Sequence, residues 1–200
     1  MKKLFACLLL IGTTGLASAQ VSNFTGFSGA VNLSSVSSRT EVDRQFQLGG
    51  DNWGGSVQAA YGLELSNSSV IGFGLNYSLG NSKSGATYKN NVATDTANIK
   101  NQYSFYLEPG SLLSDNTLLY GKISVEKGKF AVTSTPASDS FSKSISGTGY
   151  GVGLRHMLDK SKFVQVEFMK VAYKTITAPD LTTKIKSSTT LGTIGMGMKF

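Results

Sequence analysis

Apolar residues recur at every second position over most of this chain, and this alternation constrains its fold more than any other feature. In one segment Ile71, Phe73 and Leu75 alternate with glycine and asparagine. A period of two is that of an extended strand, because successive side chains point to opposite faces. The pattern occurs in eight segments, residues 27–34, 53–65, 71–79, 102–108, 119–126, 149–156, 164–169 and 193–200. The chain is therefore predicted to be all-β, with eight strands.

The polar faces of these segments consist mostly of glycine, serine and asparagine, and the chain contains 23 glycines. A soluble sheet would carry more lysine, glutamate and threonine at its solvent-facing positions. Small polar residues suit the crowded interior of a narrow barrel whose apolar face points outward to lipid. The composition thus favours a transmembrane barrel over a soluble sandwich.

The connections between the segments are predicted to alternate in length. Short ones are expected at residues 66–69, 109–116 and 158–161, and long ones at residues 37–50, 80–100, 127–146 and 174–187. Short periplasmic turns and long external loops are typical of outer-membrane barrels, with both termini in the periplasm. Residues 20–200 are therefore predicted to form one antiparallel, up-and-down transmembrane β-barrel.

The first nineteen residues have the features of a secretory signal. Lys2 and Lys3 precede an apolar run at residues 4–11, and residues 17–19 form a small-x-small cleavage site. The only cysteine, Cys7, lies in this segment. A lipoprotein cleavage at Cys7 would cut before most of the apolar run, so cleavage after Ala19 is expected. The mature chain would then contain no cysteine, which excludes disulfides and thiolate metal sites.

The chain ends in TLGTIGMGMKF, where Ile194, Met196 and Met198 alternate with small or polar residues before the terminal Phe200. This ending is similar to the signal that the barrel assembly machinery reads. Together with the secretory signal and the strand layout, it resembles the small eight-stranded outer-membrane barrel family. That family contains OmpX and the membrane domain of OmpA, and its members are often labelled porin-like. The resemblance implies a monomer in the outer membrane of a Gram-negative bacterium, and it leaves the function open.

The inward faces are predicted to carry a polar network of ionisable residues, namely Glu64, Glu108, Lys122, Glu126, Arg155 and Glu167. Folding the sixth and seventh strands about residue 160 places Arg155 opposite Gln165 and one diagonal step from Glu167, within reach of a long side chain. Buried charges are costly unless they are paired, so we expect Arg155 to bridge to Glu167. Such a network would plug the barrel.

The fourth and fifth strands are expected to turn at residues 112–113. This register places Tyr106 opposite Tyr120, Ser104 opposite Lys122, and Glu108 below Lys122 on the neighbouring strand.

Basic residues near the strand ends are expected to contact phosphorylated lipopolysaccharide, since cations gain free energy near anionic membrane surfaces. They are Lys100, Lys127, Lys129 and Lys174. Lys170 either faces lipid near the interface or is turned inward by a bulge. Aromatic residues at strand ends are expected to form interfacial girdles on the outer face. They are Trp53, Tyr77, Tyr103, Tyr150, Tyr173 and Phe200.

Catalytic signatures are weak. The only histidine, His156, is followed two positions later by Leu158. In the lipid A deacylases among eight-stranded barrels, serine occupies that position. The palmitoyltransferases among them have a histidine in the N-terminal part of the barrel, where this chain has none. We therefore expect no catalytic residues, no metal site, no cofactor and no nucleic-acid partner.

Three functions remain open: a non-enzymatic barrel that presents its external loops for membrane integrity, surface interaction or adhesion; a narrow passive channel for ions or small solutes; and, remotely, a lipid-modifying enzyme. An eight-stranded barrel has an interior wide enough only for its own side chains or one small ligand, which favours the first.

Overall fold

The computed structural model describes residues 21–42, 46–89, 92–134, 140–177 and 184–200, so the predicted secretory signal lies outside the described residues. The elements are a short 3₁₀-helix, η1 (Val21–Phe24), and the strands β1 (Gly26–Val42), β2 (Phe46–Ser66), β3 (Ser69–Ser78), β4 (Ser82–Lys89), β5 (Val92–Ser114), β6 (Thr117–Ser134), β7 (Phe141–Met157), β8 (Lys162–Tyr173), β9 (Ile176–Thr177) and β10 (Lys184–Lys199).

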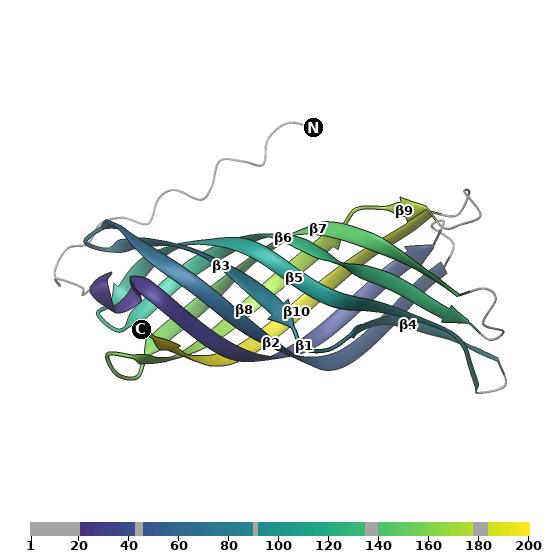
Figure 1. Ribbon diagram of the computed structural model, residues 1–200, viewed down its shortest axis with the longest axis horizontal. Helices are drawn as coiled ribbons and strands as arrows, with labels where there is room; N and C mark the ends of the chain where they lie inside the picture. Colours follow the sequence, from purple (N-terminus) through teal and green to yellow (C-terminus); the bar gives the residue numbers. More distant parts are fainter. Residues whose placement is uncertain (1–20, 43–45, 90–91, 135–139, 178–183) are drawn as a thin grey trace.

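The strands form a closed antiparallel ring in which sequence neighbours lie side by side (Figure 1). β3 and β4 both pair with β5, and β8 and β9 both pair with β10, so each of these pairs occupies one place in the ring. The ring closes because β10 pairs with β1 from Ser28↔Lys199 to Val42↔Ile185. The predicted eight-stranded up-and-down barrel is confirmed. Among the described residues, no helix has the length and apolar character needed to cross a membrane.

In the half of the barrel that holds the C-terminus, apolar side chains point outward. Phe105, Ile123 and Val152 are 58%, 58% and 59% exposed, whereas Asn32 and Gln58 are buried inside. On β5 the exposed residues from Leu113 to Tyr103 cover roughly 33 Å of strand at ~3.3 Å per residue. A strand tilted by about 40° converts this into a band about 25 Å tall, which matches the apolar band of an outer-membrane barrel.

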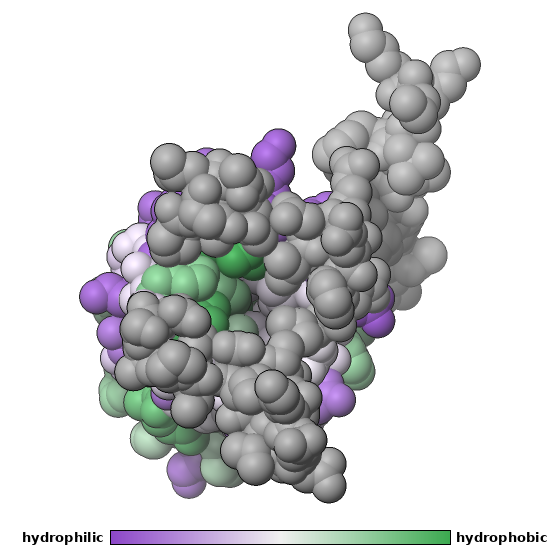
Figure 2. Space-filling model, turned by 90° about the vertical axis from the view of Figure 1, so that its right-hand side faces the viewer, coloured by the Kyte–Doolittle hydropathy of each residue, from purple (hydrophilic) through white to green (hydrophobic). Residues whose placement is uncertain are grey.

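Towards the other end of the barrel, which we term the hairpin end, the pattern reverses and apolar side chains point inward. Ile99 and Phe130 are almost completely buried there. They belong to one cluster, Ala97, Ile99, Phe130, Ile145, Met169, Val171, Tyr173 and Ile185. Figure 2 looks onto this end and shows hydrophobic residues within the ring of strands. The hairpins therefore have an apolar core of their own.

This core corrects the prediction of four long loops. Most of residues 37–50, 80–100, 127–146 and 174–187 extend the strands, so that β1 continues to Val42 and β2 begins at Phe46. Tyr173 is also corrected: it was expected in an outer girdle but lies inside the barrel. The alternation on β8 places Lys170 and Ala172 outward and Val171 and Tyr173 inward. The other five aromatic residues of the predicted girdles are exposed.

A β-bulge on β5 reverses the inward and outward positions of that strand. The pairing with β6 shifts between Lys100 and Tyr103, and Asn101 has a φ of 49°. Asparagine tolerates this left-handed conformation better than most residues. As a result Tyr103 is exposed while Ile99, also odd-numbered, is buried. On β5 the extra residue at the bulge thus turns the apolar positions from the outward to the inward face. On β6 and β8 the same switch comes from a change in which positions of the sequence are apolar.

The β5–β6 connection is shorter than predicted, which changes the register. β5 continues through Pro109, which pairs with Ile71 of β3, and the turn consists of residues 115–116. Their Asp-Asn sequence favours a turn, because both side chains can hydrogen-bond the local backbone. Tyr106 therefore lies opposite Ser124 and not opposite Tyr120. Ser104 likewise lies opposite Glu126 and not opposite Lys122.

The end of the barrel with the short turns is closed by η1. Val21 and Phe24 are buried in a second apolar cluster that includes Leu118, Met157 and Phe163. Lys199 near the C-terminus bonds the Ser22 carbonyl and holds η1 against β10. Figure 1 shows η1 beside the C-terminus at this end.

The β7–β8 turn lies where the sequence predicted a short connection. The Asp159 carboxylate accepts hydrogen bonds from the backbone N–H groups of Ser161, at 2.8 Å, and Lys162, at 2.7 Å. These bonds lower the pKa of Asp159 below its usual value, because they stabilise the ionised form.

Candidate functional site: a buried ion-pair network in the lumen

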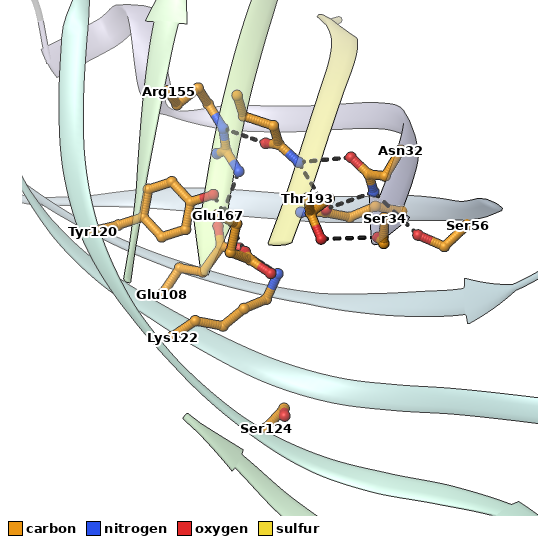
Figure 3. A network of polar contacts seen from close by, with 12 residues as sticks. Asn32, Ser34, Ser56, Glu108, Tyr120, Lys122, Ser124, Arg155, Glu167 and Thr193 are labelled. Carbon is orange, nitrogen blue, oxygen red and sulfur yellow. Dashed lines mark hydrogen bonds and ion pairs between the residues drawn. The ribbon is translucent and has the colours of Figure 1, made fainter. Parts of the chain in front are cut away.

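Four charged side chains from four consecutive strands meet inside the barrel (Figure 3). Lys122 Nζ lies 3.2 Å from Glu108 Oε1 and 2.7 Å from Glu167 Oε2. Arg155 Nη2 lies 3.0 Å from Glu108 Oε2. All four side chains are at least nine-tenths buried. The charges thus alternate along a chain from Arg155 through Glu108 and Lys122 to Glu167, which compensates their burial.

The structure brings four of the six predicted network residues together and gives Arg155 a partner other than the predicted one. Arg155 lies opposite Gln165, as predicted, and its Nε donates to Gln165 Oε1 at 3.1 Å. The expected ion pair with Glu167 is wrong. The guanidinium bonds Glu108, and Glu167 is taken by Lys122. Glu108 and Arg155 come from β5 and β7, which only β6 separates, so the long Arg155 side chain reaches the Glu108 carboxylate inside the barrel.

Amides extend the network to the far wall of the barrel. Gln165 Nε2 donates to Asn32 Oδ1 at 3.0 Å and to Gln58 Oε1 at 3.1 Å. Ser34 and Thr193 form a further hydrogen bond of 2.8 Å between β1 and β10. Polar contacts therefore cross the interior from β5 to β1 and close it with side chains at this level.

Tyr106 and Tyr120, which were expected opposite each other on the inward faces, pack against the cations of the network. Lys122 Nζ lies 4.2 Å from the Tyr106 ring centroid, and Arg155 Cζ lies 5.2 Å from that of Tyr120. The Tyr120 hydroxyl also donates to Glu167 at 3.3 Å. Glycines make room for both rings: a Cβ at Gly74 would overlap Tyr106, and one at Gly153 would overlap Tyr120. In both cases an inward glycine lies directly opposite the tyrosine on the neighbouring strand, and this pairing is the sequence signal for the packing of the ring.

The remaining two members of the predicted network lie elsewhere. Glu126 is buried, but its carboxylate accepts from the Ser124 hydroxyl at 2.6 Å and forms no ion pair with another described residue. Glu64 is exposed near the β2–β3 turn, so its assignment to the buried network is wrong.

Beyond the ion pairs, towards the hairpin end, lies a polar cavity of about 70 Å³. Its lining includes Asn32, Gln102, Glu126 and Thr189. A cavity of this size holds a few water molecules, since one needs about 10–15 Å³ of such volume. The apolar cluster of the hairpin end lies beyond it. The described lumen thus consists of an apolar layer, an ionic layer, a small polar cavity and a second apolar layer.

His156 lies apart from these groups. It is exposed, and its Nδ1 lies 2.9 Å from Thr117 Oγ1. In the described part of the chain, no group of three or more histidine, cysteine, aspartate or glutamate side chains is placed to hold a metal ion.

The predicted surface residues lie on the outward face. Lys127 and Lys129 are exposed, Lys100 is half-buried opposite Lys129, and Lys174 is exposed directly after β8. Lys170 is also exposed and lies opposite the outward Tyr150, so no bulge turns it inward. The terminal residues Ile194, Met196, Met198 and Phe200 are all exposed on or next to β10.

A closed antiparallel ring with an apolar band outside and a paired ionic network inside defines the class of membrane-spanning β-barrels. More particularly, the chain belongs to the outer membrane protein beta-barrel domain family, whose model matches residues 5–200. Its location is accordingly the outer membrane of a Gram-negative bacterium.

Two solved structures show the same fold. Ail, the attachment invasion locus protein of Yersinia pestis, is 18% identical with a TM-score of 0.52, and the match covers 88% of this chain and 100% of Ail. Neisserial surface protein A is 13% identical with a TM-score of 0.54, and the match covers 88% of this chain and 99% of that protein. Among curated proteins, no sequence matches this chain.

Proposed function

We propose that this protein is a non-enzymatic, closed outer-membrane barrel that displays its hairpin end outside the cell as a surface for interaction or adhesion. In this proposal residues 1–19 are removed on secretion, and the short turns and both mature termini lie in the periplasm. The alternation of short turns with long hairpins supports this orientation.

The observation that carries the proposal is the ion-pair network. Glu108, Lys122, Arg155 and Glu167 satisfy one another across the lumen, which favours a sealed scaffold over an open channel. The apolar core of the hairpin end adds a second argument, because it makes a rigid platform of segments that would otherwise be loops. Ail, which shares the fold, has been solved in complex with the heparin analogue sucrose octasulfate, and this supports an interaction role for the hairpin end.

Single-channel recording of the refolded protein in a planar bilayer tests the closed state. We expect wild-type protein to give small or brief conductance and Arg155→Ala to give more. Steady, large conductance that is the same in both proteins would instead establish the narrow channel. Cleavage of a protease site inserted at residues 135–139 by protease added to intact cells tests the orientation. Protection of that site in intact cells would overturn external display.

A further inference from the structure

A group of basic side chains lies on the outward face immediately beyond the apolar band. On β6 the outward residues Ile123 and Val125 are followed by Lys127 and Lys129. On β8 the outward Phe168 is followed by Lys170. These lysines thus lie on the outward face just past the end of the apolar band. We term Lys100, Lys127 and Lys129 the basic patch.

The basic patch places like charges side by side. Lys100 of β5 pairs directly with Lys129 of β6. Side chains at such positions have Cβ atoms about 4.5–5.5 Å apart, and like charges there are destabilising. Lys127 follows two residues along β6, roughly 7 Å away. In the described part of the chain, none of Lys100, Lys127 and Lys129 forms an ion pair with a carboxylate, so no carboxylate there neutralises the patch.

A groove of about 280 Å³ runs beside the patch. Lys127 and Lys129 of β6 line it together with Ser144 and Ser146, their partners on β7. Tyr103 and Asn101, the residue at the bulge, line it from β5. The lining therefore combines ammonium, hydroxyl and amide groups, which are the donors that bind a phosphate oxygen.

We infer that the basic patch and its groove bind a phosphate group of a phosphorylated glycolipid in the outer leaflet. The inference rests on the proposed orientation of the barrel. The lysines project sideways from the wall, at the level where lipid headgroups meet the apolar band, and do not cluster over the mouth of the barrel. An anion bridging Lys100 and Lys129 also converts the repulsion between them into attraction.

The test is a titration of detergent-refolded protein with phosphorylated lipid A and with the same glycolipid after removal of its phosphates. The test variant is Lys100→Gln/Lys127→Gln/Lys129→Gln. The control variant, Lys83→Gln/Lys160→Gln/Lys162→Gln, removes the same charge from exposed lysines elsewhere. A third variant with arginine at the three patch positions keeps the charge. Heat-modified mobility on gels confirms that each variant is folded.

We expect affinity for the phosphorylated glycolipid to fall about five-fold for each lysine removed. The control and arginine variants should bind as wild type does, and the dephosphorylated glycolipid should show no difference among the variants. Wild-type affinity in the test variant, or an equal loss with the dephosphorylated glycolipid, would overturn the inference. If the triple glutamine variant does not fold, Lys129→Gln alone gives the same comparison.

Competition distinguishes the sources of phosphate. Inorganic pyrophosphate and a soluble sulfated polysaccharide should displace the glycolipid only weakly, because neither has an acyl anchor beside the apolar band. Displacement by either at the concentration at which the glycolipid binds would assign the patch to a soluble anion and overturn the glycolipid. Because this titration requires neither a closed lumen nor intact cells, its failure is distinguishable from failure of the proposed function.

Discussion

Arg155 contacts residues of two other strands inside the barrel. Its guanidinium bonds Glu108 of β5 and Gln165 of β8, and it lies 5.0 Å from the Phe163 ring centroid. The side chain therefore links three strands through contacts of different kinds. Because Glu108 is almost completely buried, the loss of Arg155 would leave that carboxylate with Lys122 alone.

Arg155→Ala is expected to lower the free energy of unfolding by about 3–5 kcal/mol, the usual cost of removing one partner of a buried ion pair. Urea unfolding in detergent or lipid vesicles measures this change. Lys162→Gln is the matched control, because its ion pair with Asp159 is exposed to solvent and should contribute little to stability. Equal effects of the two substitutions would contradict the structural role of Arg155.

Gly153→Ala is expected to destabilise the barrel by about 1–3 kcal/mol, because the new methyl group overlaps the Tyr120 ring. The Tyr120 hydroxyl is tied to Glu167, which hinders the ring from moving away. Gly121→Ala is the control, since its Cβ would meet only the Gly151 carbonyl oxygen, at 4.0 Å. Tyr120→Leu should largely rescue Gly153→Ala, and a double-mutant cycle without coupling would refute the overlap.

At the scale of elements, β6, β7 and β8 are each divided into two parts with opposite patterns. β6 carries Ile123 and Val125 outward in the band and Phe130 inward beyond it. The barrel therefore has its apolar residues on the outer face within the lipid-facing band and on the inner face beyond the band. The two parts depend on different interactions, so they should respond differently to substitution.

Phe130→Ala is expected to loosen the hairpin end while leaving the membrane part folded. Removing a buried phenylalanine typically costs about 3–5 kcal/mol, here from a cluster separated from the ionic layer by the polar cavity. Hydrogen exchange should rise in β4–β7 near Phe130, whereas heat-modified mobility should persist. Global unfolding with no local phase would show that the two parts form one cooperative unit.

The C-terminal strand carries the predicted assembly signal, and Phe200→Ser is expected to reduce the amount of folded barrel in the outer membrane. The unassembled protein should accumulate in the periplasm, open to proteolysis. Phe27→Ser is the control, because Phe27 is exposed at the same end and its carbonyl accepts the Phe200 N–H. If both substitutions reduce assembly equally, the loss reflects apolar surface and not recognition of the terminal residue.

At the scale of the whole molecule, side chains fill the lumen in several layers in series, and in the proposed closed barrel each layer acts as a barrier. η1 and its cluster close the short-turn end, the ion pairs close the middle, and the second apolar cluster closes the hairpin end. A solute would have to pass all three. A change in one layer should therefore increase leak less than changes in two.

Deletion of residues 21–24 is expected to cause little conductance alone and to enhance the leak of Arg155→Ala when the two are combined. The deletion removes Val21 and Phe24 from the apolar layer, whereas the ion pairs remain. Planar-bilayer recording of the two single variants and the double variant measures the difference. Leak from the double variant no greater than that from Arg155→Ala alone would show that η1 does not seal the barrel.

The sequence by itself determined the fold class, the number of places in the ring and the outward apolar face, because alternation with a period of two is local and each strand displays it. The opposition of Arg155 and Gln165 was predictable for the same reason, since a short turn fixes the register of its two strands.

Only the tertiary structure decided what happens across the lumen and beyond the band. Glu108 became the partner of Arg155 because the inward side chains of β5 and β7, which β6 separates in the ring, meet inside the narrow barrel. The hairpin-end core formed because polar stretches such as residues 127–146 carry inward Phe130 and Ile145, whose partners Ile99 and Val171 come from other hairpins. The Asn101 bulge shifted the pairing of β5 by one residue, and a strand's own alternation does not reveal such a shift. Local periodicity specifies which residues share a face, whereas contacts across the lumen depend on register, bulges and ring closure together.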